Sequence, residues 1–212
     1  ITSDNDCYSL SGAAYGVYSD KGCTKSVATL TTNRAGNTDT VELRAGTYYV
    51  KETKAPKGFQ LDKEVYTLTV KAGETATLKV SDTPKVTDNL IELFKIDMET
   101  SNGTPQGNAA LEGAEFVWKY YDGYFTKDNL PSAPTRTWTT KTKAEKGGDG
   151  TIHYITKLAD SYKVSGDSFY TQDGAICLPL GTITVEEKAA PNGYLLDGAY
   201  MQANGNSEKI TG

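Results

Sequence analysis

The sequence predicts an all-β protein built from two tandem copies of one β-sandwich. Three observations favour this fold class: a strand-rich composition, short segments in which polar and apolar residues alternate, and an internal repeat. The 212 residues include 29 Thr, 14 Tyr and 21 Gly, which are typical of strands and turns. A chain of this length has room for two small domains. No long amphipathic helical pattern interrupts the strand-like segments.

The internal repeat divides the chain. Residues 46–62 align with residues 181–197, and the shorter block 10–15 aligns with block 111–116. The matching pairs in the longer blocks are Gly46 and Gly181, Glu52 and Glu187, Pro56 and Pro191, Gly58 and Gly193, and Asp62 and Asp197. Because the blocks keep the same order in both halves, we predict a first sandwich at residues 1–84 and a second at residues 85–212.

The second copy is longer than the first. Gly12 and Gly46 are 34 residues apart, whereas Gly113 and Gly181 are 68 residues apart. We therefore predict an insertion in the second copy, near residues 119–173. A polar segment at residues 83–88 includes a proline, which cannot donate a hydrogen bond to a sheet, so this segment is expected to be a short linker.

Alternation predicts the individual strands. Residues 65–70 and 75–80 are expected to form a hairpin around a turn at residues 71–74. In the returning strand, the apolar side chains of Ala76, Leu78 and Val80 fall on one face. Residues 90–96 are expected to open the second copy as another strand. Several short strands with regular turn signals favour an antiparallel sandwich in each copy.

Composition and charge exclude several classes of function. The net charge of −5 and the lack of a basic block argue against nucleic-acid binding. Apolar runs of about five residues are far shorter than the roughly 20 that cross a bilayer, so we expect no membrane insertion. One His and three Cys leave little scope for metal sites or His-based catalysis, and we expect no metal and no cofactor. No signal peptide or anchor pattern is visible, so an exported protein would contain this chain as a mature or excised piece.

The cysteines give one candidate cross-link. Cys7 and Cys23 close a short loop near the N-terminus, and we predict a disulfide between them, with two buried thiols as the alternative. Cys177 lies far away in an apolar segment and is expected to be a small core side chain.

The repeated motifs resemble those of a known family. An opening strand with Lys95, a Leu-x-Gly-Ala-x-Phe/Tyr block and a Glu-x-x-x-Pro-x-Gly-Phe/Tyr block are together similar to Cna B-type domains of Gram-positive surface proteins and pilins. These domains are also called SpaA-type or prealbumin-like. The resemblance implies a seven-stranded sandwich of immunoglobulin-like, reversed topology. It also implies a spontaneous isopeptide bond between a Lys on the first strand and an Asn or Asp on the last, assisted by the motif glutamate.

These residue types suit that chemistry. The attacking amine must be neutral, whereas Lys in water has a pKa of about 10.4 and is charged. An apolar core disfavours the charged form of both an amine and a carboxylic acid. A neutral Glu can then hydrogen-bond the acceptor carbonyl and transfer protons, and folding holds the reacting groups together.

Mapping the family pattern onto this chain places two of three residues in each copy. The resemblance implies that Lys95 is the donor and Glu187 the acid of the second copy. In the first copy Glu52 is the acid and Asp82 the acceptor. The first six residues contain no Lys, so the first donor is expected before Ile1, or else the two cysteines supply the tie. The second acceptor is expected just past Gly212, since Asn204 and Asn206 have the pattern of turn residues.

Aromatic residues are dense in the predicted insertion. The candidates are Trp118, Tyr120, Tyr121, Tyr124 and Trp138. They form either a ligand surface for sugars or peptide side chains, or an extra hairpin whose aromatic side chains cover the sandwich. We prefer the second interpretation.

The predicted function follows from these points. We predict a structural stalk or pilin-like segment, extracellular and attached to the cell wall or a pilus through other parts of its parent protein. Its partners would be neighbouring domains of that protein. The alternative is an adhesin whose aromatic insertion binds a host matrix protein or a glycan. An enzyme with turnover is not expected, because we find no nucleophile–base set, metal cluster or phosphate loop.

Overall fold

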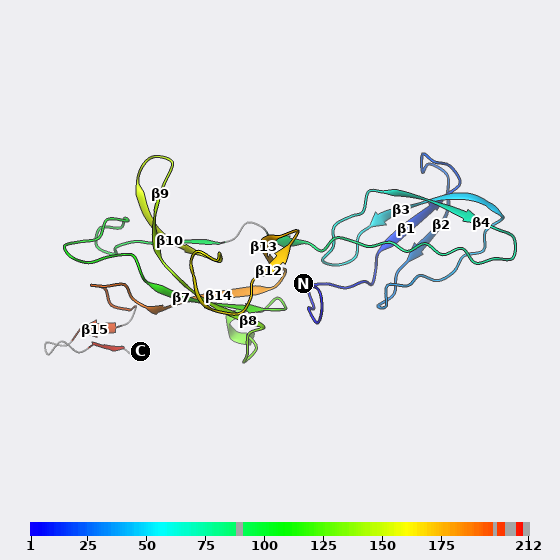
Figure 1. The fold of residues 1–212 in the computed structure, drawn as a ribbon. Coiled ribbons are helices and arrows are strands. Elements are labelled where there is room, and N and C mark those ends of the chain that lie inside the picture. Colours follow the sequence, from blue (N-terminus) through cyan, green and yellow to red (C-terminus); the bar gives the residue numbers. More distant parts are fainter. Residues whose placement is uncertain (88–90, 197–198, 202–206, 210–212) are drawn as a thin grey trace. The chain divides into compact units, whose positions relative to one another are not determined.

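The computed structural model describes residues 1–87, 91–196, 199–201 and 207–209 (Figure 1). The chain forms two compact units, Ile1–Val86 (unit 1) and Thr87–Gly212 (unit 2). The predicted all-β class is confirmed: within the described ranges the one helical element is a short 3-10 turn, η1 (Lys127–Asn129). No helix in this part of the chain is long and apolar enough to cross a membrane.

Unit 1 is built on a four-stranded antiparallel sheet. Its strands, in the spatial order β2-β1-β3-β4, are β1 (Ala14–Tyr18), β2 (Ser26–Thr31), β3 (Gly46–Lys54) and β4 (Val65–Val70). The inner face of the sheet contributes Tyr15, Val17 and Val50 to the core. Alternation along each strand places these side chains on one side.

The opposing layer of unit 1 is not a hydrogen-bonded sheet. Residues 75–82 run extended, but no backbone–backbone hydrogen bond joins them to other described residues. Leu78 and Val80 still pack against the core, as their alternation predicted. The predicted hairpin of residues 65–70 with 75–80 is therefore wrong: β4 pairs with β3 instead. Alternation predicts which face of a segment is buried, but not which segment it pairs with.

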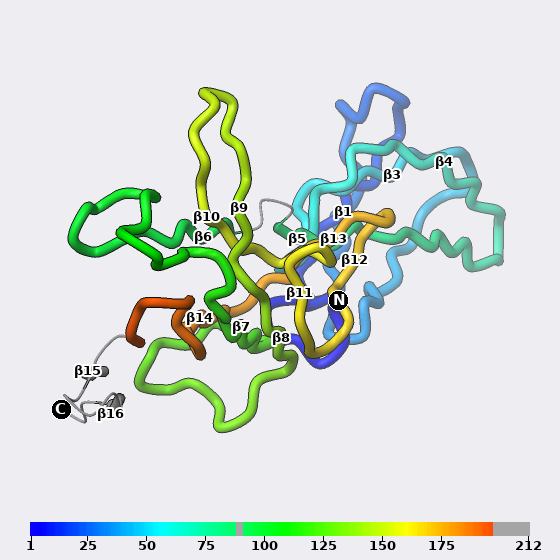
Figure 2. The backbone as a smooth tube through the Cα atoms, turned by 60° about the vertical axis from the view of Figure 1, so that its left-hand side comes forward, coloured from blue at the N-terminus to red at the C-terminus, as the bar shows by residue number. Residues whose placement is uncertain are grey.

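Unit 2 contains more strands. They are β6 (Glu92–Lys95), β7 (Glu115–Tyr121), β8 (Arg136–Lys141), β9 (Lys143–Lys146), β10 (Ile152–Lys157), β11 (Lys163–Gly166), β12 (Tyr170–Gln172), β13 (Ala175–Pro179), β14 (Thr182–Ala189), β15 (Ala199–Met201) and β16 (Ser207–Lys209). A further short strand, β5 (Val86–Thr87), lies at the boundary of the units. One sheet has the order β11-β8-β7-β14 and another the order β6-β10-β9. The β9–β10 hairpin projects beyond the rest of unit 2 (Figure 2).

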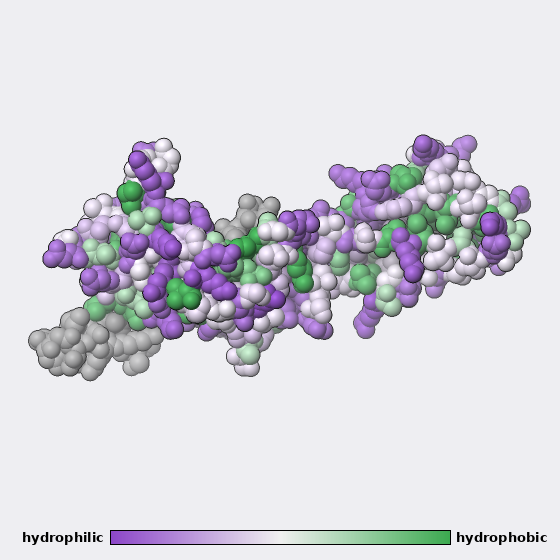
Figure 3. Space-filling view, viewed as in Figure 1, coloured by the Kyte–Doolittle hydropathy of each residue, from purple (hydrophilic) through white to green (hydrophobic). Residues whose placement is uncertain are grey.

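The core of unit 2 is aromatic. Trp118, Tyr120 and Trp138 are almost fully buried together with Leu158 and Leu178. On the face shown in Figure 3, polar residues predominate and apolar residues lie in small groups. Large aromatic side chains in the interior contribute much of the buried apolar area of a small domain.

The two copies of the Leu-x-Gly-Ala block share one local structure. Gly12 and Gly113 have φ of 88° and 90°, which favours glycine. In unit 1 the Thr32 hydroxyl donates to Leu10 O (2.5 Å) and accepts from Ala13 N (3.0 Å). In unit 2 the Thr142 hydroxyl donates to Leu111 O (2.7 Å) and accepts from Ala114 N (2.9 Å).

These threonines show where the second copy is longer. Thr32 follows Gly12 by 20 residues, whereas Thr142 follows Gly113 by 29. Strand β8, which leads to Thr142, therefore corresponds to β2. Part of the predicted insertion at residues 119–173 extends the β7–β8 hairpin, and the rest follows Thr142.

Candidate functional site

The two motif glutamates occupy the same place in their units. Glu52 on β3 lies opposite Tyr15 on β1, and Glu187 on β14 lies opposite Phe116 on β7. Each glutamate thus faces the aromatic residue that ends the Leu-x-Gly-Ala block of its own unit. What surrounds the two carboxyl groups differs.

In unit 2 the glutamate meets a lysine. Lys95 Nζ lies 2.9 Å from Glu187 Oε2, and the side chains are 19% and 17% exposed. Alternation on β6 turns Leu93 and Lys95 inward. Since β6 and β14 belong to different sheets, this ion pair connects the two layers of unit 2. Glu187 Oε1 is buried and has no hydrogen-bond partner among the described residues.

An aspartate fixes the end of the lysine strand. Asp97, two residues after Lys95, is 3% exposed and accepts hydrogen bonds from Tyr194 Oη (2.7 Å) and from the backbone N–H groups of Glu99 and Thr100. The Tyr194 hydrogen bond is the main reason that the pKa of Asp97 is lowered to about 2. The motif glycine before Tyr194 has φ of 87° and its Cα lies against Ala109.

Sequence reasoning missed Asp97 and Thr142. Asp97 had a local signal, since an Asp directly after a predicted strand is typical of an Asx turn. Thr142 had none, because it lies outside both aligned blocks. Asn204, Asn206 and Asp197, which the sequence analysis considered, lie outside the described residues.

In unit 1 the glutamate meets hydroxyl and acidic groups instead. Glu52 is 1% exposed, and its Oε2 accepts a hydrogen bond from Asp62 N at 2.6 Å. The Tyr15 hydroxyl also lies near the Glu52 carboxyl group. Glu52 Oε1 and Asp82 Oδ1 are both buried without a partner in the described part of the chain. No described Lys or Arg forms an ion pair with either residue.

Burial sets the proton affinity of this cluster. Desolvation raises the pKa of Glu52, and the nearby charge of Asp82 raises it further, against the hydrogen bond from Asp62 N. Desolvation and the charge of Asp62 raise the pKa of Asp82 as well. The Tyr15 pKa is also raised, chiefly by burial. All three groups therefore favour their neutral forms.

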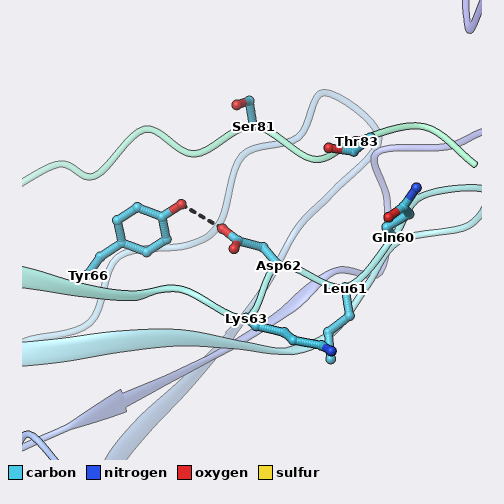
Figure 4. Close-up of a pocket in the computed structure, with 7 residues that line it drawn as sticks. All are labelled: Gln60, Leu61, Asp62, Lys63, Tyr66, Ser81 and Thr83. Atoms are coloured by element: carbon cyan, nitrogen blue, oxygen red, sulfur yellow. Dashed lines mark hydrogen bonds between the residues drawn. The ribbon is translucent and has the colours of Figure 1, made fainter. Parts of the chain in front are cut away.

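A cavity of about 390 Å³ lies beside the cluster (Figure 4). Its lining residues are Gln60, Leu61, Asp62, Lys63, Tyr66, Ser81 and Thr83. Figure 4 shows the hydroxyl of Tyr66 directed at Asp62, to which it donates a 2.6 Å hydrogen bond. Around this cluster, no group of three or more His, Cys, Asp or Glu side chains is placed to hold a metal ion, nor anywhere else among the described residues.

Comparisons with known proteins identify the fold of unit 1. Residues 2–84 match the family model of the SpaA prealbumin-like fold domain. Residues 2–84, which make up most of unit 1, are therefore similar to a prealbumin-like domain of the SpaA type. The chain is also 39% identical over 89 residues to the trypsin-resistant surface T6 protein of Streptococcus pyogenes serotype M6, covering 38% of this chain and 16% of that protein.

Two solved structures are similar over most of the chain. The Bacillus anthracis TIE protein is 26% identical with a TM-score of 0.52, covering 89% of this chain and 27% of that one. A C-terminal fragment of the pilus adhesin SpaC from Lactobacillus rhamnosus GG is 17% identical with a TM-score of 0.41, covering 99% and 77%. The chain thus spans about a sixth of the T6 protein and about a quarter of the TIE chain.

The structure corrects the predicted disulfide of the prealbumin-like domain. None of the three cysteines forms a disulfide: Cys7 and Cys177 are buried and Cys23 is partly exposed. Cys7 lies against Gly58 beyond the end of β3, whereas Cys23 lies in the turn after β1. The five residues of β1 separate these positions by about 15 Å, and a disulfide needs Cα atoms within about 7 Å.

Four of the five aromatic residues considered for a ligand surface are buried, so they do not form that alternative. Trp118, Tyr120, Tyr121 and Trp138 are at most 6% exposed, and Tyr124 alone of the five is exposed, at 66%. The Trp118 indole donates to Thr140 Oγ1 (2.8 Å) inside the core. Alternation along β7 and β8 turns Trp118, Tyr120 and Trp138 inward, where they form part of the core of unit 2.

Proposed function

We propose that the chain is a structural segment of a Gram-positive surface protein or pilus, made of two consecutive prealbumin-like domains at about residues 1–84 and 85–212. The name of the T6 relative supports a surface location. The shared threonine arrangement and the shared position of the motif glutamates support treating unit 2 as a second domain of the same kind. The segment would be extracellular, attached through other parts of its parent protein, with neighbouring domains as its partners.

The observation that carries the proposal is the partly buried contact of Lys95 with Glu187 across the two sheets. Transfer of one proton from the ammonium to the carboxylate gives a neutral amine beside a neutral acid. The amine nitrogen then attacks the side-chain carbonyl carbon of an Asn or Asp on the last strand. A C–N bond forms as the bond from the carbonyl carbon to the Asn nitrogen, or to the hydroxyl of a protonated Asp, breaks. Glu187 gives its proton to the departing ammonia or water and takes up the second proton that the attacking nitrogen loses.

The resulting amide would tie the first strand of unit 2 to its last. A pulling force applied at the ends of the domain would then load a covalent bond before it reaches most of the sheet hydrogen bonds. The reaction occurs once in each molecule, so it is self-cross-linking without turnover.

For unit 1 we propose the complementary arrangement. Glu52 would act as the acid and Asp82 as the acceptor, with a lysine supplied from outside residues 1–212. The unpartnered oxygens of both residues support a site that an amine can complete. The external lysine would then form an amide with Asp82, assisted by Glu52, of the same kind as the cross-link proposed for unit 2.

Intact mass spectrometry in denaturant tests the proposal, using the chain extended past Gly212 into the following residues of its parent. One bond in unit 2 lowers the mass by one ammonia or one water. Glu187→Gln should abolish this loss, whereas Glu92→Gln should preserve it, because Glu92 pairs with Lys157 at the surface. An unchanged mass in the extended wild-type chain would contradict the proposal.

A further inference from the structure

We propose that residues 75–83 of unit 1 form a pH-sensitive strap, closed while Glu52 and Asp82 are protonated and released when these carboxyl groups ionise. This inference concerns the 212-residue chain without any cross-link, so it does not depend on the proposed function. Water supplies and takes up the protons.

The strap is held by few interactions. Its residues 75–82 make no backbone–backbone hydrogen bond with other described residues. Gly73, with φ of 75°, forms the turn before it, and Gln60 N donates to Thr83 O (2.9 Å) at its end. Between these points, the strap contacts the core through the apolar side chains of Leu78 and Val80. The Oδ1 atom of Asp82 is also buried. A segment with so few backbone hydrogen bonds opens at low cost.

The second element is the carboxyl pair beneath the strap. Glu52 comes from the sheet and Asp82 from the strap, and each has one buried oxygen without a partner. Two ionised carboxylates in such surroundings repel each other and lose hydration. Ionisation therefore favours the open strap, in which Asp82 reaches water.

The groups that face this pair offer no compensating charge. Tyr15 on β1 supplies a hydroxyl group. Asp62, just before β4, accepts a hydrogen bond from the hydroxyl of Tyr66 on β4 and adds a further acidic group. Lys63 lies on the rim of the cavity, where it is exposed, and makes no ion pair with Glu52 or Asp82.

The sign of the pH effect follows from burial. The pKa values of Glu52 and Asp82 are raised in the closed state by desolvation and by neighbouring acids. The closed strap thus binds more protons than the open one. Closure is favoured at acidic pH and weakens as the pH rises through the closed-state pKa values of the two carboxyl groups. Each unit by which a closed-state pKa exceeds the open-state pKa changes the ratio of closed to open molecules about tenfold.

Opening would change the surface of unit 1. Ser81 and Thr83 of the strap form one wall of the 390 Å³ cavity, so this cavity would open toward the carboxyl pair. Leu78 and Val80 would leave the core. Lower pH therefore favours the closed strap, and higher pH favours the state in which the inner layer of unit 1 is accessible.

Nuclear magnetic resonance on the 212-residue chain tests the strap directly. Side-chain carboxyl signals of Glu52, Asp82 and the exposed Glu42 would be followed from about pH 3 to about pH 9, with the methyl signals of Leu78 and Val80. We expect Glu52 and Asp82 to titrate above Glu42, and both methyl signals to change in the same pH range.

Variants separate the strap from general unfolding. Glu52→Gln with Asp82→Asn keeps the side-chain shapes and should abolish the methyl changes, whereas Glu42→Gln should leave them intact. Methyl signals that stay constant across the range, or carboxyl groups that titrate with Glu42, would overturn the proposal, and the wild-type titration decides this even if the double variant fails to fold. Failure of cross-linking in the extended chain would leave this titration unaffected.

Discussion

Units 1 and 2 place the same motif glutamate at the same position and surround it with opposite chemistry. Glu187 faces the ammonium of Lys95 at 2.9 Å, whereas Glu52 faces the Tyr15 hydroxyl and the acid Asp82. Lys95 comes from β6, whereas Tyr15 comes from β1 and Asp82 from the strap. The repeated motif therefore determines where the acid sits, and residues outside the motif determine which groups surround it.

The difference shows two ways to keep a carboxyl group inside a small sandwich. A buried carboxylate is costly unless it is paired or neutralised. Unit 2 pairs it with a cation, which joins its two sheets. Unit 1 offers no cation, and burial raises the pKa of its glutamate, so the neutral acid is favoured there. Substitutions can test what the units share and what separates them.

The largest effect is expected where the units agree. Thr142→Val removes the hydroxyl that satisfies Ala114 N and Leu111 O, and leaving these buried groups unpaired should cost about 2–4 kcal/mol. Urea unfolding followed by tryptophan fluorescence reports on unit 2, because Trp118 and Trp138 both lie there. Thr32→Val should destabilise unit 1 similarly, measured by hydrogen exchange of β1 and β2. A negligible effect of either variant would contradict the shared role.

A smaller effect is expected where the units differ. Lys95→Met leaves Glu187 partly buried without its cation and should destabilise unit 2 by about 1–3 kcal/mol. Lys157→Met, which breaks the surface pair with Glu92, should cost at most about 0.5 kcal/mol. Adding Glu187→Gln to Lys95→Met should recover part of the loss. Equal costs for the two lysine variants would show that the Lys95 contact is an ordinary surface pair.

Acid should separate the units further. Tyr194 in unit 2 corresponds to Phe59 in unit 1, which has no hydroxyl. Tyr194→Phe removes the hydrogen bond to Asp97, so the pKa of Asp97 should rise from about 2 toward its usual value. Stability from a lowered carboxyl pKa is present above the usual value and lost as the pH falls. As the pH is lowered, the variant should therefore lose the ordered turn at Asp97 at a higher pH than the wild-type chain does. Hydrogen exchange of the backbone amides in this turn, measured against pH, would show the difference. An exchange profile identical to that of the wild-type chain would contradict this role of Tyr194.

The smallest effect concerns the thiols. The denatured chain without reductant should show three free thiols. In the native chain Cys23 should react before the buried Cys7 and Cys177, because a thiol reagent must reach the sulfur. Labelling followed by peptide mapping gives the order, and one free thiol instead of three would restore the Cys7–Cys23 disulfide.

Sequence reasoning succeeded where a pattern was repeated or local. The all-β class came from composition and alternation, and the motif register led to Glu52 and Glu187 before any geometry was known. The inward direction of Lys95 followed from its apolar strand. These features depend on one or two neighbouring elements, which a sequence displays directly.

It failed where the answer depended on distant pairing. Alternation in residues 75–80 showed the buried face but not the absence of a ladder partner. Closeness in sequence suggested the Cys7–Cys23 bond, although a strand lies between the two positions. A dense run of aromatic residues suits either a core or a binding surface, and only the packing of Trp118 on Trp138 and their neighbours decides between them.

Amine labelling of the native chain tests most directly whether Lys95 is the enclosed partner of Glu187. The chain would be treated briefly with an amine-reactive reagent at neutral pH, digested and mapped, and the extent of labelling compared at Lys95, Lys157 and Lys71. Lys95 should label far more slowly than the other two, whose side chains are more exposed, and Glu187→Ala should raise its rate. Labelling of Lys95 in the wild-type chain as fast as at Lys71 would contradict its place in the site.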